Sequence, residues 1–235
     1  ITFQKGMGTM YDKAQRMVAL SKHLMAELGE TSPTIERTAL LAKADLTTKL
    51  VFEFTELQGF IGADYARVSD EDAKVCEGIK EHYFPLNAES ETAKTIEGQI
   101  AGIADKIDNI CAVFVDGKKP TGSSDPLGVR RAALGIIRTI LEYGLKININ
   151  ALIDKTLELL PIKRDCAEEI REFIIQRLII FLNDSYGKTV LEACAANALS
   201  NLNDYIERVK VVSTLDNTEL LESANRVLRI TKDVA

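Results

Sequence analysis

The chain has 235 residues, of which 46% are hydrophobic and 27% charged, and its formal net charge is −6. This length and composition are typical of a globular protein with one large or two small domains, and the acidic balance argues against a globally basic nucleic-acid binder. Because no apolar run approaches the ~20 residues that cross a bilayer, we expect no membrane segment.

The first residues and the cysteines indicate a cytoplasmic protein. The chain begins with ITFQKGMGT, which has neither an initiator methionine nor the apolar core of a signal peptide, so we expect a segment of a longer protein. The four cysteines stand far apart and form no CxxC pair. This pattern predicts buried free thiols rather than disulfides or a metal site, at Cys76, Cys111, Cys166 and Cys194.

Helical periodicity dominates the N-terminal half. Apolar positions at steps of three and four predict an amphipathic helix over residues 10–28, closed by Gly29. Ser32 and Pro33 then form a helix start, and this second helix is expected to run to about Leu46. Two further helices are expected in this half, over residues 71–83 and 96–111.

The stretch LLAKADLTTKLVFEFTELQGFIGADYA, residues 40–66, is the one around which we expect the chain to be organised. We expect the preceding helix to continue through it or to break briefly before Val51. Its apolar residues follow helical spacing and predict burial on more than one side, at Leu46, Leu50, Phe52, Phe54, Leu57 and Phe60. Because buried acids and amides need partners, the polar residues between them, such as Asp45, predict part of a polar site.

Residues 116–126, DGKKPTGSSDP, form the longest turn-forming stretch and predict a domain boundary. We therefore expect one helical domain over residues 1–117 and a second over residues 118–235. Further helices are expected after the boundary, over residues 149–160, 166–182, 189–199, 202–212 and 220–230. The predicted fold class is all-α.

The first helix of the second domain has a recognisable start. Asp125 as N-cap and Pro126 in the first turn predict that it begins there and ends at Gly144. Its apolar positions, among them Leu127, are expected to face inward.

The sequence carries none of the common catalytic signatures. It has no GxSxG, P-loop, HExxH or GxGxxG motif, and its two histidines are too few for a histidine-rich metal site. Three acids attract more attention, because the phrases LLAKAD and IADKID set Asp45, Asp105 and Asp108 at the inner edge of apolar helical faces.

These phrases resemble the HD-domain phosphohydrolases, an all-α family whose metal site uses histidines, a His-Asp pair and a later Asp. Asp45 matches the Asp of the pair, Asp105 the later Asp, and His82 a histidine found in some relatives. Ala44 stands where the metal-binding histidine belongs, and the first histidine is missing near Lys13. The resemblance implies an HD-like domain with a vestigial site that binds no metal, since the imidazole ligands are absent.

A closer resemblance covers the whole chain. LAKADLTTKLVFEFTELQGFIGADYA, EHYFP, IADKIDNI and PTGSSDPLGVRRAALGIIRTIL follow one another as in the bacterial glycyl-tRNA synthetase β-subunit. SANRVLRITKD resembles the start of the final helical region of that family. Residues 118–235 would then lead into its anticodon-binding region.

This resemblance implies a cytoplasmic α₂β₂ enzyme that ligates glycine to tRNA(Gly) with ATP and magnesium. Adenylate formation belongs mainly to the α-subunit of that family, and the β-subunit contributes tRNA binding through its HD-like and anticodon-binding parts. The segment in hand is therefore expected to hold no cofactor and to be inactive alone.

Positive charge concentrates at and after the turn-forming stretch, at Lys118, Lys119, Arg130 and Arg131. A helix start with exposed backbone N–H groups favours phosphate, so these residues are candidate RNA contacts. The alternative is that the two arginines brace acids such as Asp105 in ion pairs.

Two other functions remain open from the sequence. One is a working HD-type phosphohydrolase that uses Asp45, His82 and Asp105. The other is a structural module for subunit contact that does not touch RNA. Metal binding would distinguish the phosphohydrolase from an RNA-binding protein. RNA binding would distinguish an RNA-binding protein from the structural module.

Overall fold

The computed structural model describes residues 1–121 and 124–214, with 223, 226 and 227, and over these residues the protein is all-α, as predicted. Its α-helices are α1 (Met10–Leu28), α2 (Pro33–Leu41), α3 (Lys49–Glu53), α4 (Phe60–Val68), α5 (Ala73–Glu81), α6 (Ile96–Val115), α7 (Val129–Tyr143), α8 (Ile149–Leu159), α9 (Ala167–Tyr186), α10 (Lys188–Ala193) and α11 (Leu202–Ser213). Short 3-10 helices join them at η1 (Ala44–Thr47), η2 (Thr55–Leu57), η3 (Pro126–Gly128) and η4 (Ala198–Ser200). The predicted helix over residues 220–230, with the phrase SANRVLRITKD, lies outside the described residues apart from positions 223, 226 and 227.

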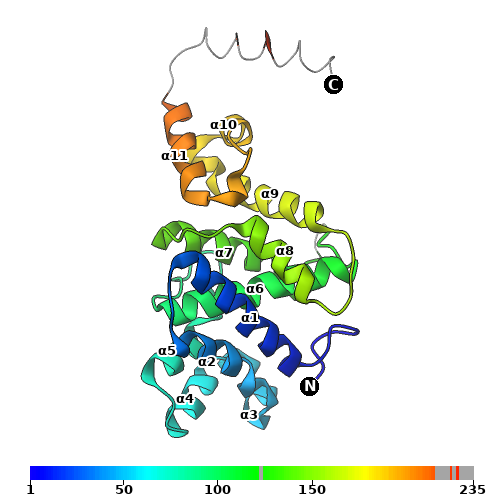
Figure 1. Ribbon diagram of the computed structural model, residues 1–235, viewed down its shortest axis with the longest axis vertical. Coiled ribbons are helices and arrows are strands. Elements are labelled where there is room, and N and C mark those ends of the chain that lie inside the picture. Colours follow the sequence, from blue (N-terminus) through cyan, green and yellow to red (C-terminus); the bar gives the residue numbers. More distant parts are fainter. Residues whose placement is uncertain (122–123, 215–222, 224–225, 228–235) are drawn as a thin grey trace.

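The helices form an elongated stack (Figure 1). α2 to α5 lie at one end, α1, α6, α7 and α8 occupy the middle, and α9 leads to α10 and α11 at the other end. Over the described residues, no helix combines the length and the apolar character that crossing a bilayer requires.

The first helix forms where the apolar spacing and Gly29 predict it. Thr9 and Asp12 exchange hydrogen bonds as a capping box, and Gly29 ends the helix in the left-handed conformation with φ of 69°. The helix buries Met17, Leu20 and Leu24 against its neighbours. The predicted helix over residues 10–28 is therefore confirmed.

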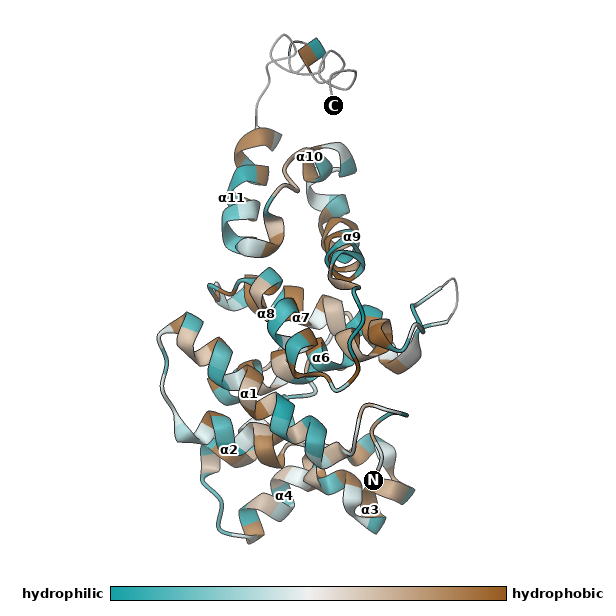
Figure 2. Cartoon of the chain, turned by 45° about the vertical axis from the view of Figure 1, so that its right-hand side comes forward, coloured by the Kyte–Doolittle hydropathy of each residue, from teal (hydrophilic) through white to brown (hydrophobic). Residues whose placement is uncertain are grey.

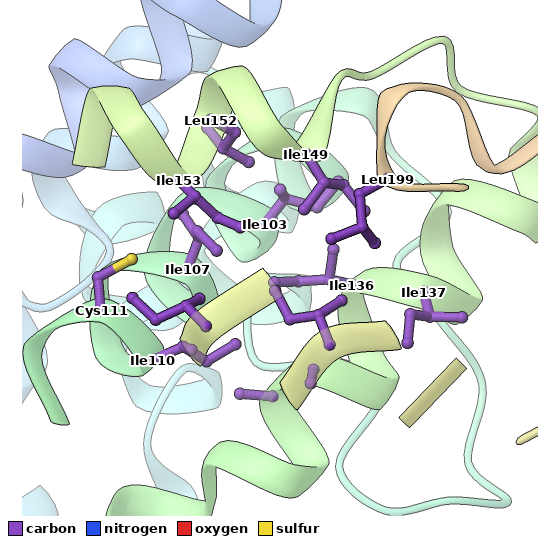
Figure 3. Packing of buried hydrophobic residues seen from close by; sticks show 14 of the residues in the cluster. Ile103, Ile107, Ile110, Cys111, Ile136, Ile137, Ile149, Leu152, Ile153 and Leu199 are labelled. Atoms are coloured by element: carbon purple, nitrogen blue, oxygen red, sulfur yellow. The ribbon is translucent and has the colours of Figure 1, made fainter. Parts of the chain in front are cut away.

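α6 is the central helix of the protein. Nearly all of its side chains are buried, because α1, α2 and α5 pack on it from one direction and α7 and α8 from the other. In Figure 3 the isoleucines of α6 meet those of α7 and α8, with Ile103, Ile107 and Ile110 facing Ile136, Ile149 and Ile153. Each such side chain stabilises the fold by about 1.5–3 kcal/mol. One hydrophobic cluster thus includes residues from both sides of the boundary predicted at 117/118, and the division into two domains stays a prediction.

The stretch over residues 40–66 breaks before Val51, which is one of its two predicted forms, and it then breaks again. It forms η1, α3, η2 and α4 in sequence rather than one continuous helix, because Thr48 is extended and caps α3, and Gly59 takes a φ of 81° before α4. The apolar stripe is not buried either, since Phe52 is 80% and Phe54 50% exposed. Figure 2 shows α3 at the periphery of the molecule, where few elements are available to cover it.

The predicted start of α7 is also wrong. Asp125 precedes a 3-10 turn that starts at Pro126, in which Leu127 has a φ of 53° and is exposed, and the α-helix begins only at Val129 with Gly128 as N-cap. Asp125 still acts near the helix end, because its Oδ1 accepts the backbone N–H of Arg130 at 3.1 Å. The C-terminal end at Gly144 is confirmed by its left-handed conformation.

The cysteines are as predicted. All four are free and buried, and burial raises the pKa of the Cys111 thiol well above its ordinary value. They act as small apolar side chains in the core.

Candidate functional site

A network of buried charges joins α1 to α6. The Lys13 ammonium lies 2.9 Å from Oδ2 of Asp108 and 3.0 Å from Oδ1 of Asp105, the latter as a charge contact rather than an aligned hydrogen bond. Arg16 donates to the same Asp108 carboxylate through Nε at 2.6 Å and Nη2 at 3.1 Å. Asn109 Oδ1 accepts a further bond from Lys13 at 3.0 Å. Two charges from one helix therefore neutralise two carboxylates from the other.

The second part of the network comes from the segment after α2. Lys43 Nζ lies 2.8 Å from Asp105 Oδ2 and 2.8 Å from Nε2 of His82, and it sits 3.9 Å above the Tyr83 ring. Nδ1 of His82 lies 2.5 Å from the Ile79 carbonyl oxygen, so the neutral ring donates there and accepts from Lys43.

Burial and neighbouring charge set the protonation states of this network. Burial lowers the pKa of His82 well below its ordinary value, and Lys43 lowers it further, so the ring is neutral at physiological pH. Burial alone would raise the pKa of Asp105, but Lys13 and Lys43 outweigh it and hold that pKa below its ordinary range. Asp105 is therefore a carboxylate held between two ammonium groups.

Lys106 extends along a channel between α6 and α7. Its Nζ donates to the carbonyl oxygen of His82 at 2.9 Å and approaches that of Gly102 at 3.4 Å, without a carboxylate partner among the described residues. Burial lowers the pKa of Lys106 from 10.5 to about 8, so most of the molecules carry the charge at neutral pH.

Part of this network borders a cleft of about 470 Å³. Four cations line it, Lys13, Lys43, Lys106 and Arg131, against the single carboxylate of Asp105. Apolar and aromatic residues complete the walls, among them Phe3, Leu46, Tyr83 and Leu127. An excess of positive charge in a partly apolar cleft suits an anionic organic ligand.

Asp45 lies outside this network. It is 2% exposed, its Oδ2 accepts the backbone N–H of Gly59 at 2.7 Å, and its Oδ1 has no hydrogen-bond partner. Asp45 and Asp105 both accept hydrogen bonds, as buried carboxylates require. Of the three residues of the predicted vestigial site, the structure joins His82 and Asp105 through Lys43, while Asp45 contributes to a separate pocket between α2, α4 and α5.

Comparison with known proteins identifies the family. The profile described as Glycyl-tRNA synthetase beta subunit matches residues 1–196. The chain is 35% identical over 243 residues to the glycine–tRNA ligase beta subunit of Trichlorobacter lovleyi, an alignment that covers 99% of the chain and 35% of that protein. It is 40% identical over 194 residues to the protein of the same name from Picosynechococcus sp., which covers 80% of the chain and 27% of that protein. The chain belongs to the glycyl-tRNA synthetase beta subunit family.

This membership confirms the resemblance drawn from the sequence phrases. The chain spans about a third of the length of the curated relatives it matches, since the alignments cover 35% of the Trichlorobacter lovleyi and Geobacter sulfurreducens proteins. The Geobacter sulfurreducens beta subunit is 37% identical over 99% of the chain.

The four candidate RNA contacts of this family member fall in two places. Lys118 and Lys119 form surface ion pairs with Asp116 at 2.7 Å and with Glu169 at 2.5 Å. Arg131 is exposed and borders the cleft. Arg130 is half-buried and lies near Arg177 of α9. The pKa of Arg177 is lowered mainly by burial and further by the positive charge of Arg130. Within the described residues neither arginine forms an ion pair with Asp105 or another acid, so the bracing of Asp105 comes from lysines instead.

The sequence did not predict the lysines that line the cleft, which are Lys13, Lys43 and Lys106. Lys43 directly precedes Ala44, and Lys13 stands where the first histidine was sought, so both were visible as departures from the HD pattern. Among the described residues, no group of three or more His, Cys, Asp or Glu side chains is placed to hold a metal ion. Ammonium groups occupy the positions beside Asp105 instead.

Proposed function

We propose that this chain is an RNA-binding part of the beta subunit of a cytoplasmic glycine–tRNA ligase. In this proposal the whole enzyme is an α₂β₂ assembly that uses ATP and magnesium to attach glycine to tRNA(Gly), and this segment holds the tRNA while the α-subunit performs most of the chemistry. The observation that carries the proposal is the match of the family profile to residues 1–196.

The charge pattern supports binding rather than hydrolysis. An HD-type phosphohydrolase needs a metal between its carboxylates, but lysine ammonium groups contact both oxygens of Asp105. A cation bound there would have to displace two lysines whose own burial is compensated by that carboxylate. The cleft instead offers spare positive charge to an anion, and RNA is the anion that the family name implies.

The basic residues near the turn-forming stretch supply a second contact surface in this proposal. The ion pairs of Lys118 and Lys119 are exposed and contribute about 0–1 kcal/mol each, so a phosphate can replace the carboxylate partner at little cost. Such contacts add affinity by releasing counterions and do not read sequence.

The test is a tRNA(Gly) titration of the full enzyme across salt concentrations. Lys118→Ala/Lys119→Ala should weaken binding and reduce the slope of log K against log salt by roughly 0.7–0.9 per lost contact. Lys22→Ala/Lys94→Ala is the matched control, because both lysines are exposed and paired with a glutamate at the surface. If the Lys118→Ala/Lys119→Ala variant has the same tRNA affinity and salt slope as the control variant, this surface does not contact the tRNA. A wild-type enzyme without salt-dependent affinity for tRNA would refute the proposal.

A further inference from the structure

The three buried lysines of the cleft differ in how many of their hydrogen-bond donors are used. An ammonium group has three donors. Lys13 spends them on Asp108, Asn109 and the carbonyl oxygen of Asp105, and it is only 1% exposed. Lys43 donates two hydrogen bonds, to Asp105 and His82, and its ammonium group also makes a cation–π contact with the Tyr83 ring. Both ammonium groups are therefore occupied by the protein.

Lys106 is the exception. Its Nζ donates to one carbonyl oxygen at 2.9 Å and to another at a marginal 3.4 Å, which leaves a third donor without a partner. The residue is 92% buried, since its exposed fraction is 8%, and it borders the cleft. A buried cation without a carboxylate partner is unfavourable unless a ligand compensates it.

The fold makes room for this lysine at two glycines. A Cβ atom at Gly135 of α7 would lie 2.9 Å from Cε of Lys106, and one at Gly102 of α6 would lie 3.2 Å from its Nζ. The close approach of the two helices thus depends on residues without side chains, and the Lys106 stem passes between them. The ammonium group is held in position by the His82 carbonyl rather than left to move in solvent.

Arg131 brings a second cation to the same cleft. It is exposed, it lies in the first turn of α7, and within the described residues it has no ion-pair partner. Its guanidinium folds against Gly128, where a Cβ would lie 2.8 Å from Nη2. The N-terminal turn of α7 also borders the cleft, and a helix N-terminus favours negative charge.

We propose that Lys106 and Arg131 form a phosphate subsite in which the cleft receives a single nucleotide of an unpaired RNA segment. This inference rests on the proposed RNA-binding function and deepens it. The volume of about 470 Å³ lies in the range of small-ligand sites, and Phe3 and Leu127 offer apolar surface against which a base can lie. A duplex would not enter a cleft of this size, so the ligand is a single-stranded end or loop.

The experiment measures three ligands on the full-length beta subunit assembled in its enzyme: tRNA(Gly), the mononucleotide AMP, and inorganic phosphate. The variants are Lys106→Met, which keeps the length of the stem in its channel, and Arg131→Gln, which changes an exposed side chain and does not threaten folding. Lys146→Met is the control, because this exposed lysine follows α7 and does not border the cleft. Thermal unfolding establishes that each variant is folded.

We expect Lys106→Met and Arg131→Gln each to weaken AMP and tRNA binding by about tenfold or more, as for loss of a charge-assisted hydrogen bond. The control should leave both affinities unchanged. Normal tRNA and AMP affinity in both variants would refute the proposed phosphate subsite and would leave the proposed function intact. Loss of phosphate binding alone, with tRNA affinity preserved, would show a site for free anions and also overturn it. Absence of tRNA binding by the wild-type enzyme would instead refute the proposed function.

Discussion

Replacing Lys106 with methionine should make the protein more stable near neutral pH, although it removes a charge that we assign to ligand binding. The ammonium group is buried between α6 and α7 and has no carboxylate partner among the described residues. Its pKa falls from 10.5 to about 8 because burial disfavours the charged form. A difference of this size corresponds to a cost of about 3 kcal/mol at neutral pH.

The substitution also removes a hydrogen bond. The carbonyl oxygen of His82 would lose the 2.9 Å contact with Lys106, and an unsatisfied buried acceptor costs about 1–3 kcal/mol. Methionine fills the same channel, so no cavity term is expected. The balance is a net stabilisation on the order of 1 kcal/mol at neutral pH.

The pH dependence separates this explanation from simple repacking. Because the pKa of Lys106 is lower in the folded state than in the unfolded chain, its cost is fully present below about pH 8 and is relieved as the pH rises toward 10.5. The stability of the wild type should therefore rise relative to Lys106→Met over that interval. Denaturant unfolding of both proteins, with Lys146→Met as the surface control, measures the difference. A variant that is less stable by the same amount at every pH would refute the reasoning.

Two further predictions concern the buried network and the core. Asp108→Ala should destabilise the fold by about 3–5 kcal/mol in denaturant unfolding, because it leaves Lys13 and Arg16 buried without their shared carboxylate. The control Asp204→Ala, which breaks the exposed pair with Arg208, should cost less than about 1 kcal/mol. Equal losses in the two variants would contradict the buried-network account. Cys111 should resist thiol reagents in the folded protein and react once denatured, since burial raises its pKa, and prompt labelling of Cys111 in the native state would show that α6 opens readily.

Local signals in the sequence sufficed for much of the fold. The apolar spacing of residues 10–28 and the terminal Gly29 predict α1, and the dense isoleucine pattern of residues 96–111 predicts α6. Such features act within one or two turns of a helix, so periodicity and end signals describe them well.

The burial predicted for the apolar residues of 40–66 is wrong, because periodicity identifies an apolar helix face but not the element that would cover it. Leu50, Phe52 and Phe54 have helical spacing, but burial also requires another element to cover them, and α3 lies at the periphery. Thr48 and Gly59 then break the segment through local backbone geometry that an apolar pattern does not contain.

The candidate site was only half visible for a related reason. Asp105 and His82 carried a family resemblance, but lysines are ordinarily exposed, so nothing local marks Lys13 or Lys106 as buried. Lys13 lies about ninety positions from its carboxylates, and only the packing of α1 against α6 brings them together. The channel of Lys106 likewise depends on two glycines in different helices.

The most direct test of the central claim is whether Asp105 binds a metal or only lysines. Equilibrium dialysis of the full-length protein against Mn²⁺, followed by elemental analysis, should give the same metal content for the wild type and for Asp105→Asn, because Lys13 and Lys43 already neutralise this carboxylate. One Mn²⁺ per chain that is lost in Asp105→Asn, together with Mn²⁺-dependent hydrolysis of a phosphodiester, would contradict the account and restore a phosphohydrolase centre.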